Sequence, residues 1–380
     1  MDFALSEEQQ AIIDMARDFA ASEIAPHARA WEEAGTIPKS FWPRVAALGL
    51  GGVYVGEDHG GTGLTRLDAA LVFEALAMAC PTVAAFLSIH NMCGGMIDRY
   101  GSADLKARLL PDLCSMDRVF SYCLTEPGAG SDAAALRTRA ERVEGGWRLT
   151  GTKAFISGGG YSDAYIVMAR SGGEGPRGIS AFVVEAGTEG LSFGGLEHKM
   201  GWKAQETRAV QMDGCFVPDA NLIGELGRGF AYAMAGLDGG RLNIAATALG
   251  GAQAAFDATL RYMGERQAFG QRLDQFQALQ FRLADMEVAL QSARLFLHRA
   301  AWKLDQAAPD ASTACAMAKL QVTDVAFDVA NQCLQLHGGY GYLADYGIEK
   351  IVRDLRVHQI LEGTNEIMRV IIARKLMDRP

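Results

Sequence analysis

Five glycine-rich segments of this chain carry side chains that could bind a charged or aromatic ligand. The first, residues 125–132, reads Thr-Glu-Pro-Gly-Ala-Gly-Ser-Asp and follows a strand-like run. Its hydroxyls and free backbone N–H groups could hold a polar heterocycle, although an ordinary turn explains the same spacing. Gly128, Gly130 and Ala133 fit a G-x-G-x-x-A pattern. We reject a Rossmann site, because that site needs a helix next and the sequence continues as an alternating strand.

The second segment, residues 153–160, could cover a flat ring. It places Phe155 and Ser157 two residues apart on a predicted strand and then runs into three glycines. Side chains two apart share one face of a strand, and glycines let another group approach the backbone. The alternative is that Phe155 fills the core of a β module.

The third and fourth segments could meet phosphate groups. Arg266 stands four residues before Gly270 in a break between helical stretches, and a guanidinium can pair with two oxygens of a pyrophosphate. Residues 335–342, Gln-Leu-His-Gly-Gly-Tyr-Gly-Tyr, follow a long predicted helix. Their glycines either cap that helix or expose bare backbone to an anionic ligand.

The fifth segment carries a residue suited to proton transfer. Glu362 stands directly before Gly363, in a loop that leads into a final helix capped by Thr364 or Asn365. A carboxylate on such a loop could act as a base. The alternative is an acid that only complements the positive end of the last helix.

The elements that position these segments are of two kinds. About the first 115 residues predict helices, with a capping box from Ser6 to Gln9 and helical stretches at 67–80, 83–96 and 103–113. Strand-like runs fill most of 119–217, and Gly145 with Gly146 predicts a hairpin. Long helical patterns return from about 229, at 276–304 and 311–336. We predict an α+β fold with an N-terminal helical domain (1–118), a middle β-sheet or β-barrel-like domain (119–226) and a C-terminal helical bundle (227–380).

Composition excludes several classes of protein. The 380 residues are 49% hydrophobic and 21% charged, which excludes a disordered or collagen-like chain. A net charge of −9 without a long basic run disfavours attachment to nucleic acid or anionic lipid. The seven cysteines include no Cys-x-x-Cys pair and have no histidine at zinc-ligand spacing, so we expect reduced core residues and no metal site.

The beginning of the chain, Met1-Asp-Phe-Ala, shows no basic segment followed by an apolar one, and no window approaches the roughly 18 apolar residues that a membrane span needs. We therefore expect no membrane partner. The expected location is the cytoplasm, as for a bacterial protein, or the mitochondrial matrix if this is a mature eukaryotic chain.

Together, the segments 122–131, 153–157, 266–270, 335–339 and 361–366 resemble the acyl-CoA dehydrogenase flavoprotein family. Their order and spacing match over essentially the whole chain. The resemblance implies the fold of that family and FAD as cofactor. It also implies a homo-oligomer, in this family usually a tetramer, because one subunit contributes to the flavin site of another.

The resemblance assigns cofactor-binding residues in four groups. Around the isoalloxazine ring it places Tyr122, Cys123, Leu124, Thr125, Gly130, Ser131, Phe155, Ile156 and Ser157. On the pyrophosphate and adenosine side it places Arg266, Phe269, Phe276 and Gln277. From a neighbouring subunit it implies Gln335, Leu336, His337, Gly338 and Gly339, while Thr364, Asn365 and Glu366 border the adenosine.

Glu362 matches the base of the family, which removes the α-proton of an acyl-CoA thioester while hydride leaves the β-carbon for the flavin. Such a base needs donors that stabilise the enolate oxygen, in the family the backbone N–H of this glutamate and a flavin ribityl hydroxyl. A water-poor cleft should raise the carboxyl pKa once substrate binds. Some members carry the base just before the arginine that Arg241 matches, but Gly240 stands there. The resemblance assigns substrate contacts to Ser131, Asp238, Gly239, Gly240, Arg241 and Arg374.

Within the family, Gly201-Trp-Lys, residues 237–245 and residues 357–366 most resemble isobutyryl-CoA dehydrogenases. This implies a short, branched acyl-CoA substrate, for which the paired glycines 239 and 240 could leave room, and the breakdown of branched-chain amino acids or fatty acids. Asp238 departs from that subfamily, which tends to have asparagine, and one methyl group changes discrimination by only about 1–3 kcal/mol.

Three alternatives stay open. The substrate could be 2-methylbutyryl-CoA or a short straight-chain acyl-CoA. The electron acceptor could be oxygen, as in acyl-CoA oxidases, instead of the electron-transfer flavoprotein that the resemblance implies. DNA-binding relatives share this scaffold, but they carry a basic C-terminal extension, and this net acidic chain has none after its last predicted helix.

Overall fold

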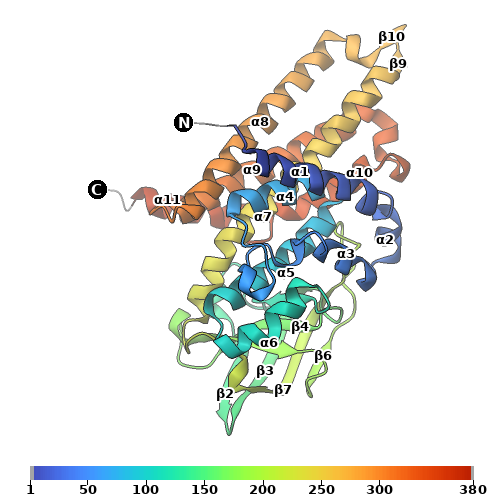
Figure 1. Cartoon of the computed structure of the whole chain (residues 1–380). Helices are drawn as coiled ribbons and strands as arrows, with labels where there is room; N and C mark the ends of the chain where they lie inside the picture. Colours follow the sequence, from blue (N-terminus) through green and yellow to red (C-terminus); the bar gives the residue numbers. More distant parts are fainter. Residues whose placement is uncertain (1–3, 378–380) are drawn as a thin grey trace.

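The computed structural model describes residues 4–377 and confirms the predicted order of helices, strands and helices. Residues 1–3 and 378–380 lie outside the described residues. They include the beginning of the chain, where no targeting segment is predicted, and the outer ends of the predicted domains 1–118 and 227–380. Figure 1 shows the strands gathered at one end, the N-terminal helices across the middle, and the long C-terminal helices extending beyond them.

The N-terminal part is helical because its apolar residues recur at helical spacing behind well-formed caps. Ser6 and Gln9 form the predicted capping box of α1, and Pro81 occupies the first turn of α5, where its missing N–H costs nothing. The helices are α1 (Glu7–Phe19), α2 (Ala28–Ala34), α3 (Trp42–Ala46), α4 (Arg66–Ala77), α5 (Pro81–Tyr100) and α6 (Ala103–Cys114).

The middle part is one sheet of eight strands in the order β6-β7-β3-β2-β4-β5-β8, with β1 added to β4 in parallel. The predicted hairpin joins β2 to β3, with Val143 opposite Gly146 and a left-handed Gly145 at the turn. The strands are β1 (Phe120–Cys123), β2 (Arg139–Val143), β3 (Gly146–Ser157), β4 (Ala164–Arg170), β5 (Ile179–Glu185), β6 (Leu191–Phe193), β7 (Thr207–Pro218) and β8 (Leu222–Ile223).

The C-terminal part is built on the long helix α7, which packs against α4, α5, α8 and α9. Glycine permits the closest approach: a Cβ on Gly250 would overlap the backbone carbonyl of Glu74 in α4. A two-strand hairpin joins α7 to α8 (Figure 1). The elements are α7 (Gly229–Glu265), β9 (Gln267–Ala268), β10 (Gln271–Arg272), α8 (Gln277–Asp305), α9 (Ala311–His337), α10 (Ile348–Arg356) and α11 (Asn365–Met377).

One apolar core runs through both helical parts, from Trp42 and Phe73 to Leu290 and Val322, while the sheet has cores of its own. All seven cysteines are buried and unpaired, as expected. Among residues 4–377, no helix combines the length and the apolar character that crossing a bilayer requires.

Candidate active site

Glu362 lies in the short loop between the turn Val357–Gln359 and α11. Both Glu362 (φ +55°) and Gly363 (φ +86°) adopt the left-handed conformation. For a residue with a Cβ this costs about 1–2 kcal/mol, and such strain persists where the surroundings fix it. The strained backbone turns the glutamate side chain inward instead of along the helix end.

Glu362 is half-buried, and its carboxylate oxygen Oε2 is fully buried with no hydrogen-bond partner among residues 4–377. Burial raises the pKa of Glu362 to about 7, against the opposing charges of Arg241 and Lys319. The pKa is therefore raised in the chain alone, before any substrate adds to it. A carboxylate with a pKa near 7 is well matched to proton abstraction at neutral pH.

Gly240 of α7 faces this carboxylate. A Cβ at that position would stand 2.5 Å from Glu362 Oε2 and 3.4 Å from Met92 Sδ of α5. The neighbouring Gly239 faces Arg66 of α4 in the same way: a Cβ on Gly239 would overlap the Arg66 guanidinium. The space that the paired glycines leave is therefore taken up by Glu362 and Arg66. Sequence reasoning missed Arg66 and Met92, because nothing in their local sequence connects them with position 240.

Arg241 and Asp238 form a buried ion pair of 2.6 Å on the same helix. Asp238 Oδ1 also accepts a hydrogen bond of 3.0 Å from Ser312 of α9, and Arg241 Nε donates to the backbone carbonyl of Glu362 at 3.4 Å. Burial raises the pKa of Asp238, opposed by Arg241. Two residues that the resemblance assigns to the substrate thus lie beside the candidate base.

Tyr122 of β1 reaches the same place from the sheet. Its hydroxyl is buried and has no partner among the described residues. Burial raises the pKa of Tyr122 well above its usual range, and the nearby Glu362 charge adds to the effect. An orphaned hydroxyl in a buried site is expensive unless a ligand satisfies it, so this position fits a site for a bound molecule.

Phe155 does not fill the sheet core: 68% of its surface is exposed. A register shift in β3 between Lys153 and Ile156 puts Phe155 at φ +57° and breaks the expected alternation of the strand. Ser157 Oγ accepts a hydrogen bond of 2.9 Å from Gln205 Nε2. An exposed aromatic ring beside a fixed hydroxyl fits a flat cofactor such as a flavin.

The loop at 125–131 is a turn, as the alternative interpretation held, and it is braced from behind. Glu126 and Ala129 exchange two backbone hydrogen bonds of 3.1 Å. The Glu126 carboxylate accepts from Lys153 Nζ at 2.8 Å, and this lysine is fully buried. Gly128 and Gly130 face open space, with no atom within 4 Å of a built Cβ. The front of the turn is thus free for a ligand.

The residues predicted for the pyrophosphate side lie at the far end of α7. Phe269 at the β9–β10 turn is 97% exposed, and its ring stands 6.4 Å from that of Phe276, edge to face. Arg266 lies over the Tyr340 ring at 5.3 Å, and Gly338 caps α9 with φ +59°, which confirms the capping interpretation of that segment. From Gly240 to Arg266 the chain follows α7 for 26 residues, about 39 Å at 1.5 Å per residue.

The four assigned positions at the end of the chain differ in environment. Thr364 caps α11 through its bond to the N–H of Ile367, whereas the Asn365 side chain is buried among α9 residues. Glu366 is exposed in the first turn of α11. Arg374 is exposed near the end of that helix and has no ion pair within residues 4–377. The structure brings Tyr122, Asp238, Gly240, Arg241 and Glu362 together, and Arg374 lies apart from them.

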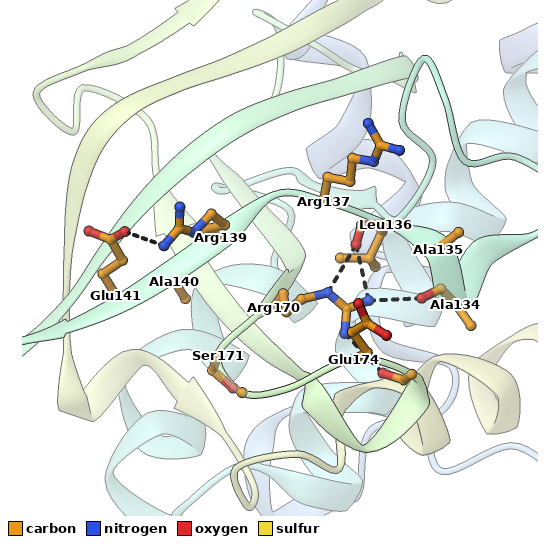
Figure 2. A pocket seen from close by; sticks show the side chains of 12 residues that line it. Ala134, Ala135, Leu136, Arg137, Arg139, Ala140, Glu141, Arg170, Ser171 and Glu174 are labelled. Atoms are coloured by element: carbon orange, nitrogen blue, oxygen red, sulfur yellow. Dashed lines mark hydrogen bonds and ion pairs between the residues drawn. The ribbon is translucent and has the colours of Figure 1, made fainter.

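A pocket of about 670 Å³ opens between the turn Ala133–Ala135, β2 and the loop after β4. Figure 2 shows Arg170 bonded to the backbone carbonyls of Ala134 and Leu136, and Arg139 paired with Glu141. The Arg137 guanidinium has no hydrogen bond or ion pair to any described residue and offers a free cation. Sequence reasoning missed this pocket, which forms only when β2 and β4 come together.

Three family models match nearly the whole chain. They describe the N-terminal domain of acyl-CoA dehydrogenases (residues 6–117), the middle domain (121–215) and the C-terminal domain (227–377). The chain is 52% identical over 373 residues to the mitochondrial isobutyryl-CoA dehydrogenase of Bos taurus and 50% identical to that of Dictyostelium discoideum. Each match covers 98% of this chain and 90% of the relative.

Solved structures agree with this result. The butyryl-CoA dehydrogenase of Megasphaera elsdenii matches with a TM-score of 0.96 and 36% identity, over 99% of this chain and 100% of that one. The FAD complex of PigA matches with a TM-score of 0.95 and 32% identity. A chain from a study of the electron transferring flavoprotein of Acidaminococcus fermentans matches with a TM-score of 0.97 and 38% identity. Each match covers 100% of both chains. The protein therefore belongs to the acyl-CoA dehydrogenase family and is a flavin-dependent acyl-CoA dehydrogenase that uses FAD.

Proposed function

We propose that this enzyme dehydrogenates a short, branched acyl-CoA of the isobutyryl type to the 2-enoyl-CoA, with Glu362 as the base. The observation that carries the proposal is the buried Glu362 carboxylate, whose Oε2 has no partner and whose pKa is raised to about 7 by burial. The branched substrate is supported by the two isobutyryl-CoA dehydrogenases that are about half identical to the chain.

In this proposal Glu362 accepts the α-proton of the thioester, so the α C–H bond breaks and its electron pair forms the new double bond. When bound, FAD supplies the acceptor for the hydride that leaves the β-carbon. The backbone N–H of Glu362 bonds no acceptor among residues 4–377, so it is free to donate to the thioester oxygen as charge develops there. The carbonyl of the same residue faces Arg241, which keeps this orientation.

The residues proposed for FAD fall into two groups. Tyr122 and the loop at 125–131 lie on the Glu362 side, together with Phe155 and Ser157 of β3. Arg266 and Phe269 lie about 39 Å along α7 from Gly240, farther than one FAD reaches. We propose that they serve the flavin of a neighbouring subunit, together with residues 335–339, which requires an oligomer such as the tetramer that the resemblance implies.

The free Arg137 guanidinium suggests where the nucleotide end of coenzyme A binds. Arg137 lines the pocket described above, whose lining residues begin at Ala134. Ser131, a proposed substrate contact, stands three residues earlier in the sequence. Phosphate groups pair well with an unengaged guanidinium. We therefore place the phosphates of the thioester in this pocket, with the acyl end directed toward Glu362.

An electron-transfer flavoprotein is proposed as the electron acceptor, because a structurally similar chain comes from work on such a protein. Oxygen is the alternative acceptor, and peroxide produced during turnover would support it. The relatives include mitochondrial and bacterial proteins, and the corresponding locations for this chain are the mitochondrial matrix or the bacterial cytoplasm. The DNA-binding alternative is disfavoured by the net charge of −9.

Anaerobic mixing with isobutyryl-, 2-methylbutyryl- and butyryl-CoA tests the proposal, with bleaching of the flavin absorbance as the signal. We expect the fastest bleaching with isobutyryl-CoA. In Glu362→Gln the rate should fall by about 10²–10⁴-fold at unchanged FAD content, because the near-isosteric amide cannot accept a proton. The control is Glu287→Gln, which changes a half-buried acid on α8 whose carboxylate accepts a hydrogen bond from Gln291 of the same helix. Wild-type bleaching in the Glu362→Gln variant would refute the assignment of the base.

A further inference from the structure

The loop that carries Glu362 is held from behind by two cations. The backbone carbonyl of Glu362 accepts from Arg241 Nε at 3.4 Å, and that of Gly363 accepts from Lys319 Nζ at 2.8 Å. Both loop residues are left-handed, a conformation that the surroundings must impose on Glu362. Two successive carbonyls of the loop are thereby fixed in position.

Lys319 lies on α9 with none of its surface exposed. Its ammonium makes a second hydrogen bond of 2.8 Å to Asn365 Oδ1, and Asn365 Nδ2 donates to Asp324 Oδ1 at 2.7 Å. Asp324 Oδ1 also accepts from Gln359 Nε2 at 2.7 Å. Lys319 therefore fixes Gly363 and Asn365 through direct hydrogen bonds. Asp324 of the same helix fixes Gln359, at the beginning of the segment.

We propose that Lys319 is the positioning residue of the catalytic loop, which it anchors through Gly363 and Asn365 while its charge favours the ionised form of Glu362. The inference rests on the proposed role of Glu362. A buried ammonium is costly unless its donors are bonded, and here two of its three N–H groups are bonded to the one loop that carries the base. A purely structural contact at this place would need no charge.

The titratable groups that face Glu362 come from three elements. Arg241 of α7 and Lys319 of α9 favour its ionised form, and the un-ionised Tyr122 of β1 completes the enclosure. Lys319 itself faces Glu362, Asp324, Glu366 and Arg241, and burial lowers the pKa of Lys319 to about 8. The ammonium is therefore mostly charged at neutral pH and loses its proton above about pH 8.

Two substitutions separate anchoring from charge. Lys319→Met removes both, and we expect kcat to fall about 10- to 100-fold, because a small misplacement of a base is costly. The acid limb of the kcat/KM profile should also move up by about one pH unit, since a nearby positive charge lowers a carboxyl pKa by that order. Lys319→Gln keeps a donor for Gly363, so it should recover part of kcat but retain the shifted profile.

The matched control is Lys303→Met, which removes a lysine of α8 that pairs with Asp310 away from the loop. It should leave both kcat and the profile unchanged. Hydrogen exchange of backbone amides 361–365 in the FAD-loaded variants gives a readout independent of turnover, and we expect faster exchange in Lys319→Met only. A correctly loaded Lys319→Met enzyme with wild-type kcat and pH profile would overturn the inference, as would unchanged exchange of amides 361–365 in that variant. If Glu362→Gln were fully active, the assignment of the base would fail instead.

Discussion

Gly240 and Glu362 are so close that a single added methyl group would stand 2.5 Å from the carboxylate oxygen Oε2. The glycine is therefore what lets the glutamate side chain lie against α7. Some members of the family carry their base at this position. Here the position has no side chain, and the carboxylate of Glu362, from a loop distant in sequence, lies next to it. This relationship makes position 240 a sensitive probe of the site.

Gly240→Ala should displace the Glu362 carboxylate and lower kcat by about 10²-fold, since misplacing a reactive group by about 1 Å has that effect. KM should change less, because the thioester contacts away from the base are kept. Gly236→Ala is the control: its Cβ would lie 3.4 Å from the flexible end of Met96, an ordinary contact. Steady-state kinetics of both FAD-loaded variants check the prediction, and equal kcat values would contradict it.

The activity should depend on pH through Glu362. Because its pKa is about 7 and only the ionised form accepts a proton, kcat/KM should rise about tenfold per pH unit below 7 and level off between about pH 7 and 8, above which Lys319 loses its proton. The profile should be recorded at constant ionic strength between pH 5 and 9. A profile that is flat from pH 5 to 7 would show that a group with a lower pKa is the base.

Thermal stability should also depend on the ionisation of Glu362, but in the opposite direction to activity: it should fall as the pH rises. The folded-state pKa of about 7 lies above the ordinary pKa of 4.5 for a glutamate, so folding favours the protonated acid. The stabilising contribution is fully present below about pH 4.5 and is lost as pH rises through 7, by at most about 3 kcal/mol at 1.36 kcal/mol per pH unit.

The FAD-loaded Glu362→Gln variant has no such charge to bury. Its Tm should therefore exceed that of the wild type by a few degrees at pH 8, and the difference should shrink at pH 5. Thermal unfolding at both pH values measures this. If the difference in Tm between Glu362→Gln and the wild type were the same at pH 5 and pH 8, Glu362 would not titrate in this range.

Arg137→Ala should raise the KM for acyl-CoA about 3- to 10-fold with little change in kcat, because in the proposed binding mode this cation meets only the nucleotide end of the substrate. The effect should weaken as salt concentration rises. Arg148→Ala, which removes an exposed arginine of β3 outside this pocket, is the control. An unchanged KM for Arg137→Ala at low salt would place the coenzyme A phosphates elsewhere.

The sequence by itself determined the order of helices, strands and helices, because hydrophobic periodicity and capping residues are local signals. Five short segments in register identified the family, and that resemblance, rather than the spacing around Glu362, assigned this carboxylate as the base. Even the boundaries of α8 and α9 fell within one residue of the predicted 276–304 and 311–336.

The tertiary structure decided what surrounds that carboxylate. Met92 and Lys319 come from α5 and α9, and no local pattern links them to position 362; only packing brings them there. The exposure of Phe155 depended on a register shift in β3, which sequence alternation cannot reveal. Burial and charge act over distances in space, so the raised pKa of Glu362 is a property of the folded chain and of no segment within it.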